Sequence, residues 1–230
     1  MSGDSIGGTS EVLMVTGSNV IVDISHHNAR VDLKKAKAAG LEAVIHKATQ
    51  GLSFQDEKFA ANRAKIKAAG LLFGAYHFGT GADPVGQANF FLKIVSPQPG
   101  DLLVLDFEEN KSNTMSLDQA RAFVLRVREA TGRMPGLYAG HFLKEKLGAK
   151  LDPLLSQCWL WHAQYGPEPK IHKNWKSWTM WQYTDGNAGS EPHTVDGIGA
   201  CDRETFNGTL AELKAFWAAQ SMPAALGAGG

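Results

Sequence analysis

The chain has 230 residues, of which 43% are hydrophobic, and this is enough to form one domain with a substantial core. Lysine and arginine together number 23, as do aspartate and glutamate, so the formal net charge is zero. This balance gives no electrostatic reason to expect binding to nucleic acid or to an anionic membrane surface. The apolar runs are far shorter than the roughly 20 residues of a membrane-spanning helix, so no membrane insertion is expected.

The two ends of the chain differ in composition from the rest. Residues 1–19 contain Gly, Ser and Thr but neither a basic segment nor a continuous apolar run, so a Sec signal peptide is not predicted. We therefore expect synthesis in the cytoplasm. We expect residues 1–18 to be a flexible extension, residues 19–220 to be one domain, and the Ala- and Gly-rich residues 221–230 to be a disordered tail.

Between these ends, short apolar runs alternate with amphipathic segments. In chain order they predict a strand over residues 20–24, a helix over 31–39, a strand over 43–46, a helix over 56–69, a strand over 71–78, a helix over 84–95, a strand over 101–105, a helix over 116–131, a strand over 136–139, a helix over 141–147, strands over 158–163, 179–183 and 198–202, and a closing helix over 210–219. Eight strands, the first five of them alternating with helices, predict an α/β fold: a TIM-like parallel barrel with an irregular second half.

A pair of acids ends the fourth predicted strand. Four aliphatic residues, 102–105, are followed by Asp106, Phe107 and Glu108. Because side chains alternate along a strand, Asp106 and Glu108 point to the same side. Two neighbouring carboxyls at the end of a buried strand cannot both ionise cheaply, so one pKa should rise. A protonated acid beside an anion is what cleavage of a glycosidic bond requires. The alternative is a strand that has reached the surface and become polar.

Polar and aromatic side chains recur at the carboxyl ends of the other predicted strands, where the active sites of such barrels lie. They are Asp23, His46, Lys47, Tyr76, His77, Tyr138, Gln164, Tyr165, Trp181, Gln182, Tyr183 and Asp202. Aromatic rings stack on the apolar faces of sugars, so Tyr76, Tyr138, Tyr165 and Trp181 are candidates to line a saccharide groove. Packing at the end of the barrel is the alternative for each ring. The remaining tryptophans, including Trp161, are assigned to the core or to loops.

Two further groups of residues have other possible roles. His26, His27, His46 and His77, with Asp23, would suit a metal-dependent deacetylase or amidohydrolase. Adjacent histidines on a strand point to opposite sides, however, and no HExxH motif or paired-cysteine spacing is present. We therefore expect neither a metal nor any other cofactor. Phosphate-binding glycine loops and a GxSxG motif are also absent. The two cysteines, at 158 and 201, are expected to be buried free thiols in strands.

Taken together, the strand-end segments resemble glycoside hydrolase family 25, the Chalaropsis-type lysozymes, which cleave peptidoglycan between N-acetylmuramic acid and N-acetylglucosamine. The matching segments are VDISHH at 22–27, VIHKATQG at 44–51, GAYHF at 74–78, LDFE at 105–108, LWHAQY at 160–165 and WQYT at 181–184, followed by Asp202. They occur in the family order and span the whole predicted domain. Each is weak alone, but six in sequence are specific.

The resemblance implies a (β/α)5(β)3 barrel in which Glu108 is the general acid and Asp106 its neighbouring carboxylate. It implies that Asp23 and Asp202 are two further acids of the catalytic groove. Substrate contacts are expected from Tyr76, Phe78, Tyr138, Tyr165, Trp181 and Gln182. Family members are described as retaining, with the acetamido oxygen of the substrate as nucleophile and Asp106 positioning it.

Two positions depart from common family members. Gln50 stands where Glu is frequent, and Arg203 stands in a segment that is more often aliphatic. Both bear on substrate contacts and not on the acid pair. A chitinase-type barrel is the nearest competing enzyme, but its DxxDxDxE pattern requires an acid at Val104.

The sequence thus predicts a muramidase, with a non-catalytic glycan-binding barrel and a metal-dependent deacetylase as alternatives. Peptidoglycan strands are the expected partner, and the protein is expected to be a monomer. Without a predicted signal peptide, the two routes to the wall that we consider are release as a phage endolysin and injection as an antibacterial effector. An effector would need an immunity or secretion-adaptor protein.

Overall fold

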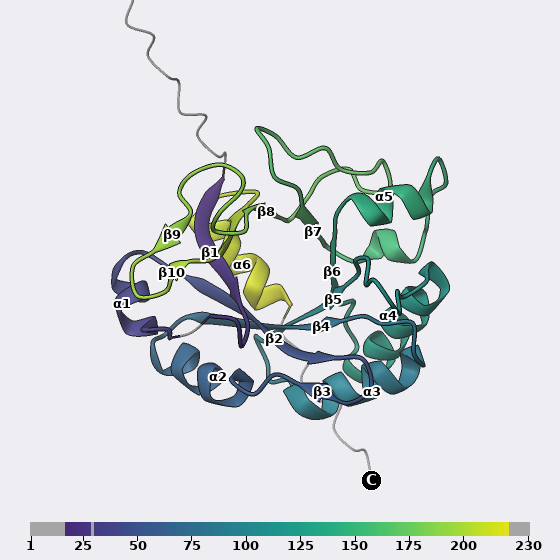
Figure 1. Cartoon of the computed structure of the whole chain (residues 1–230), viewed down its shortest axis with the longest axis horizontal. Helices are drawn as coiled ribbons and strands as arrows, with labels where there is room; N and C mark the ends of the chain where they lie inside the picture. The colour runs from purple at the N-terminus through teal and green to yellow at the C-terminus, as the bar shows by residue number, and fades with distance from the viewer. Residues whose placement is uncertain (1–16, 29, 221–230) are drawn as a thin grey trace, which may run out of the picture.

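A computed structural model describes residues 17–28 and 30–220 of the chain. The expected disordered tail at 221–230 and all but the last two residues of the expected extension at 1–18 lie outside the described residues. Within the described part, eight strands form a closed barrel surrounded by helices (Figure 1). None of the helices in the described ranges is long and apolar enough to cross a membrane.

The barrel strands are β1 (Ser18–Ile24), β2 (Ala43–Gln50), β4 (Leu72–Phe78), β5 (Leu102–Asp106), β6 (Gly136–Ala139), β7 (Leu160–Ala163), β8 (Met180–Thr184) and β11 (Asp202–Phe206). They follow one another in this order around the barrel, which is closed by the pairing of β11 with β1. Outside it lie the short strand β3 (Phe54–Gln55), paired with β2, and a small hairpin of β9 (Thr194–Val195) and β10 (Gly199–Ala200).

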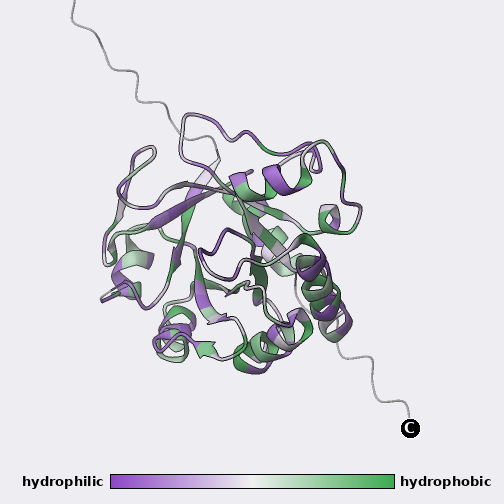
Figure 2. Cartoon of the chain, turned by 45° about the vertical axis from the view of Figure 1, so that its right-hand side comes forward, coloured by the Kyte–Doolittle hydropathy of each residue, from purple (hydrophilic) through white to green (hydrophobic). Residues whose placement is uncertain are grey.

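The helices are α1 (Leu33–Ala38), α2 (Phe59–Ala68), α3 (Pro84–Val95), α4 (Leu117–Thr131), α5 (His141–Leu147), the 3-10 turn η1 (Leu155–Gln157) and α6 (Leu210–Ala219). Helices α1 to α5 each follow one of the first five barrel strands, whereas β7, β8 and β11 are joined by loops (Figure 1). The chain is therefore a (β/α)5(β)3 barrel, as predicted. Figure 2 shows hydrophilic and hydrophobic residues alternating along the outer helices, as expected for amphipathic helices.

The last barrel strand differs from the prediction. The sequence predicted a strand over residues 198–202, with Asp202 at its carboxyl end. In the structure β11 instead begins at Asp202 and runs antiparallel to both β8 and β1, so the barrel is mixed and not fully parallel. Because the strand direction is reversed, its first residue lies at the same rim as the carboxyl ends of the other strands. Asp202 therefore lies at the predicted rim, although it begins its strand and does not end it.

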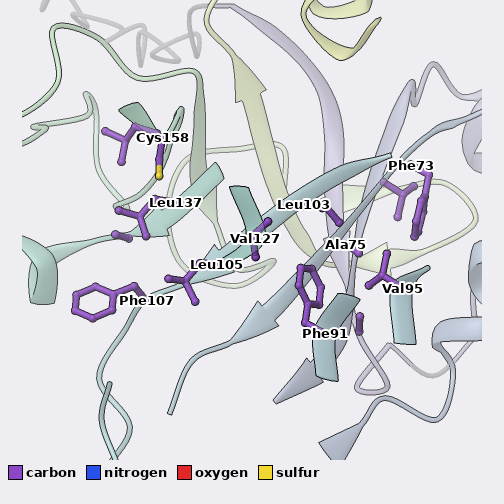
Figure 3. Close-up of a cluster of buried hydrophobic side chains, with 14 of the residues drawn as sticks. Phe73, Ala75, Phe91, Val95, Leu103, Leu105, Phe107, Val127, Leu137 and Cys158 are labelled. Carbon is purple, nitrogen blue, oxygen red and sulfur yellow. The ribbon is translucent and has the colours of Figure 1, made fainter. Parts of the chain in front are cut away.

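Side-chain alternation divides the core into two parts. Along β5, Leu103 and Leu105 face the helices and belong to a large outer cluster, whereas Leu102 and Val104 face the barrel interior. Figure 3 shows part of the outer cluster, in which Leu103, Leu105, Phe73, Ala75, Phe91, Val95, Phe107, Val127, Leu137 and Cys158 are labelled. The same alternation points Asp106 inward at the end of the strand.

Helix α6 closes the floor of the barrel. Its Leu213 and Trp217 are buried among the interior residues at the starts of the strands, such as Ala43 and Leu102. The Trp217 indole also donates a hydrogen bond to the backbone oxygen of Phe73 at 3.1 Å. The barrel is therefore filled with apolar side chains at one end, and only the opposite rim is free to hold polar groups.

Two local predictions need correction. The second predicted helix was expected to begin at Asp56, but α2 begins at Phe59, and the buried Asp56 carboxylate accepts hydrogen bonds from the backbone and ring nitrogens of His26. Cys158 and Cys201 are buried free thiols, as expected. Neither lies in a strand, however, because Cys158 ends the turn η1 and Cys201 lies between β10 and β11.

Candidate active site

A polar pocket opens at the rim of the barrel, where the carboxyl ends of the parallel strands meet the start of β11. It is lined by Asp23, Tyr76, Asp106, Glu108, Tyr138, Trp161, Tyr165, Gln182 and Asp202. A second hollow shares Glu108, Tyr138 and Tyr165 with it and continues over α5. The two hollows are therefore continuous along the rim.

The acids at the end of β5 lie in this pocket. Asp106 is the last residue of the strand and Glu108 follows two positions later, and both line the pocket. Phe107, between them, is buried in the outer cluster. Asp106 is only 5% exposed, whereas Glu108 is half-buried. The carboxyl of Glu108 is thus the more accessible of the two to a bound molecule.

Burial and mutual repulsion favour protonated acids here. The pKa of Asp106 is raised well above its ordinary value, chiefly by burial and then by the charge of Glu108. The pKa of Glu108 is also raised, first by burial and then by the charge of Asp23. The ammonium of Lys47 opposes both shifts. A proton is therefore retained by the pair toward neutral pH.

A hydrogen-bond network crosses the pocket from β6 to β1. The hydroxyl of Tyr138 donates to Oε1 of Gln182 at 2.9 Å, and Nε2 of Gln182 donates to Oδ2 of Asp23 at 2.8 Å. The Tyr165 hydroxyl also donates to Oε1 of Gln182, at 3.4 Å. Because its oxygen accepts from two tyrosines, the Gln182 amide must present its nitrogen to Asp23. This network fixes the orientation of Asp23.

Asp202 lies opposite Asp23 in the register of β11 and β1. Burial raises the pKa of Asp202 to about 8, and the charges of Asp23 and Asp185 contribute further. The pKa of Asp23 is raised too, mainly by burial. The pocket thus gathers four carboxyls, and burial raises the pKa of each of them.

Comparison with known proteins identifies the chain. A family model described as glycosyl hydrolases family 25 matches residues 22–191. The chain belongs to this family. It is therefore a glycosidase, and the resemblance noted in the strand-end segments is confirmed.

Relatives of this family 25 enzyme cover most of its length. It is 29% identical over 213 residues to Lysozyme M1 of Streptomyces globisporus, covering 84% of this chain and 69% of that protein. It is 30% identical over 185 residues to the N,O-diacetylmuramidase of Chalaropsis sp, covering 72% of this chain and 88% of that protein. A bacterial lysozyme from Streptomyces coelicolor has a similar structure, with a TM-score of 0.79, 28% identity, and coverage of 89% of this chain and 99% of that one.

Two of the residues predicted to contact substrate lie outside the pocket of this family 25 enzyme. Trp181 is 1% exposed, and its indole donates to the backbone oxygen of Gln164 at 2.6 Å. It follows from alternation that Trp181 faces outward, because its neighbour Gln182 faces the pocket. Phe78 is also absent from the pocket lining and lies beneath the Lys47 ammonium, 5.0 Å from the ring centroid.

Two residues of the site were missed in the sequence. Trp161, assigned to the core, is buried but forms part of the pocket lining, with its ring 4.8 Å from that of Tyr138. Glu204 lies inside the barrel below the pocket and is fully buried. Glu204 lies two residues after Asp202, a spacing that places both side chains on the same side of a strand. This could be recognised only once β11 was known to begin at Asp202.

The histidines considered as metal ligands lie elsewhere. His46 and His77 are buried on the outer side of the sheet, and each ring nitrogen has a hydrogen-bond partner. The partners of His46 are Asn62 and the Lys47 carbonyl, and those of His77 are Thr49 and Gln87. Across residues 17–28 and 30–220, no three His, Cys, Asp or Glu side chains are arranged to hold a metal ion.

Proposed function

We propose that this family 25 glycosidase is a lysozyme that cleaves the bond between N-acetylmuramic acid and N-acetylglucosamine in peptidoglycan. The observation that carries the proposal is the pair Asp106 and Glu108, side by side in a polar pocket at the barrel rim. The likeness to Lysozyme M1 and to the N,O-diacetylmuramidase of Chalaropsis supports the choice of substrate.

In the first step, Glu108 protonates the oxygen of the glycosidic bond. The acetamido oxygen of the substrate attacks the anomeric carbon as the leaving sugar departs, which forms an oxazolinium-like intermediate. Asp106 accepts a hydrogen bond from the acetamido N–H and stabilises the positive charge that develops. An N–H donated to Asp106 favours its ionised form. Substrate binding therefore places the shared proton on Glu108, where it is needed.

In the second step, the ionised Glu108 removes a proton from water, and the water oxygen attacks the anomeric carbon. The oxazolinium ring opens and the acetamido group is restored. Two successive displacements at the same carbon retain its configuration. Asp23 and Asp202, on the other side of the pocket, bind the hydroxyl groups of the sugar.

The test is the variant Glu108→Gln, which keeps the size of the side chain but has no acid proton to give. We expect release of reducing ends from purified cell walls to fall on the order of 10²–10⁴-fold, the usual contribution of general acid catalysis. Retention of most of the activity would refute the assignment of Glu108. Mass spectrometry of the wild-type products should show N-acetylmuramic acid at the new reducing ends.

The same assay separates the alternative functions. A glycan-binding barrel would retain muropeptides and release no reducing ends. A metal-dependent deacetylase would release acetate and lose activity on chelation.

For the biological setting we propose a lytic role at the bacterial wall, with delivery either as an endolysin or as an injected effector. An effector predicts that its producer makes a protein that binds this enzyme and protects against it. An endolysin predicts that lysis needs only a membrane pore. Lysis of Escherichia coli that depends on a co-expressed pore-forming protein is expected in either case, so the distinguishing measurement is whether a protein from the producer binds this enzyme and protects those cells.

A further inference from the structure

The residue that the mechanism leaves unused is Glu204. It faces the barrel interior from the centre of β11, opposite Ile21 of β1 and Gln182 of β8 in the strand register. Its relative exposure is 0%, so its carboxyl has no access to solvent. An acid in such a position requires a proton or a partner.

Among the described residues, no donor makes a hydrogen bond of good geometry to either carboxyl oxygen of Glu204, although the amide of Gln182, opposite it in the register, is close enough to oppose the rise in its pKa. Its neighbouring side chain Arg203 donates instead to the carbonyl of Thr194 and to the side chain of Asn19. The Asp23 carboxyl from β1 lies within hydrogen-bonding reach of Glu204, but two ionised carboxylates have no hydrogen to share. A hydrogen bond between Glu204 and Asp23 therefore needs a proton on one of them.

The surroundings decide where the proton resides. Asp23 already accepts a hydrogen bond from Gln182 at 2.8 Å, which favours its ionised form. Glu204 lies deeper than Asp23, which is 6% exposed and lines the pocket. Besides Arg203, which alternation places on the other side of β11, the titratable groups near Glu204 are Asp202, Cys201 and Tyr183, and none of these three supplies a positive charge. Burial and the charge of Asp23 raise the pKa of Glu204 well above its ordinary value.

We propose that Glu204 is a positioning residue: its protonated carboxyl donates a hydrogen bond to Asp23 from below and, with Gln182, holds that carboxylate toward the substrate. Asp23 is then held by two donors from two strands, so its free lone pairs point into the pocket. The contribution to catalysis through Asp23 rests on the proposed function, whereas the protonation of Glu204 does not.

The catalytic test compares Glu204→Gln with Glu204→Met. The two side chains have similar volumes, but only the amide can donate a hydrogen bond to Asp23. We expect kcat of Glu204→Met to fall roughly 10–100-fold, as for a displaced catalytic group, with a smaller change in KM. Glu204→Gln should restore most of this loss. Equal kcat values for the two variants, or a Glu204→Gln variant as inactive as Glu108→Gln, would overturn the proposal.

The second test measures thermal stability between pH 5 and pH 8 and needs no catalysis. The folded protein keeps the Glu204 proton at a pH where the unfolded chain has lost it, so this acid destabilises the fold as pH rises. The Tm of Glu204→Gln relative to wild type should therefore increase from pH 5 to pH 8, by about 3 °C or more. A pH-independent difference would show that Glu204 is ionised in the folded protein and would overturn the proposal.

The control is Glu42→Gln, on the far side from the pocket. Glu42 pairs with Lys37 at 2.8 Å and with Lys214 at 3.4 Å, and the Lys37 partner lowers its pKa. Its substitution should leave activity unchanged and lower Tm by an amount that hardly changes between pH 5 and pH 8, because Glu42 is ionised in both the folded and the unfolded protein over that range. If Glu108→Gln were active while Glu204→Gln showed the predicted stability profile, the proposed mechanism would fail and the protonation of Glu204 would stand.

Discussion

At the scale of single residues, the chemistry of the pocket depends on which carboxyls hold protons. Five acids, Asp23, Asp106, Glu108, Asp202 and Glu204, have raised pKa values, and burial is the largest cause for each. Lys47 is the cation whose charge opposes the shifts of Asp106 and Glu108. Each of these acids keeps its proton in the folded protein at a pH where the unfolded chain has lost it. The site therefore reduces the stability of the fold as pH rises from the pKa values of the unfolded chain toward those of the folded protein.

Asp202 allows a direct test of this cost. The pKa of Asp202 is about 8 in the folded protein and about 3.9, the ordinary value for Asp, in the unfolded chain. The free energy that Asp202 contributes to folding is therefore fully present below about pH 3.9 and is lost as pH rises to about 8. Asp202→Asn has no proton to lose. We expect its Tm to fall less than that of wild type between pH 5 and pH 8 in calorimetry. Parallel Tm profiles would contradict the raised pKa.

At the scale of elements, helix α4 connects the strand of the acid pair to the strand of Tyr138. Its first turn has a capping box, in which the Ser116 hydroxyl accepts from the backbone N–H of Gln119 and the Gln119 side chain accepts from the backbone N–H of Ser116. The Gln119 amide also donates to the backbone oxygens of Gly81 and Ala82. The cap thus ties α4 to the loop that follows β4.

Loss of this cap should destabilise the fold without affecting the chemistry. Ser116→Ala removes the hydroxyl, which costs about 1 kcal/mol at a helix N-terminus and corresponds to a Tm lower by roughly 2–4 °C in a domain of this size. Ser112→Ala, at an exposed position of the preceding loop, is the matched control and should leave Tm unchanged. Thermal denaturation measures both, and equal Tm values would show that the cap contributes nothing.

At the scale of the whole molecule, the barrel has an apolar floor and a polar rim. Trp217 and Leu213 of α6 fill the floor together with interior residues of the strands, and the acids occupy the opposite end. Such a separation allows the stability of the fold to be supplied far from the strained cluster of carboxyls. It also means that the floor can be weakened without touching the site.

Trp217→Ala tests this separation. Truncation of a buried tryptophan costs about 3–5 kcal/mol, so Tm should fall by roughly 6–20 °C. At a temperature where the variant is still folded, kcat should stay close to wild type. Leu210→Ala, 37% exposed at the start of the same helix, should change Tm little. A large loss of kcat in folded Trp217→Ala would show that floor and rim are coupled.

The sequence by itself determined the barrel class and the acid pair. Both depend on local rules: a helix after each of five strands, and alternation that places Asp106 and Glu108 on one side of β5. Trp181 and Gln182 are neighbours on β8, so alternation allows only one of them to face the pocket. That residue is Gln182, and Trp181 is buried outside the pocket lining.

The tertiary structure alone decided the direction of β11 and, with it, the role of Glu204. Strand direction is set by pairing with β1 and β8, which are distant in sequence, and no local pattern around Asp202 reports it. The contact between Glu204 and Asp23 joins residues from opposite ends of the domain. Alternation assigns a side chain to a face, but only closure of the barrel decides which faces meet.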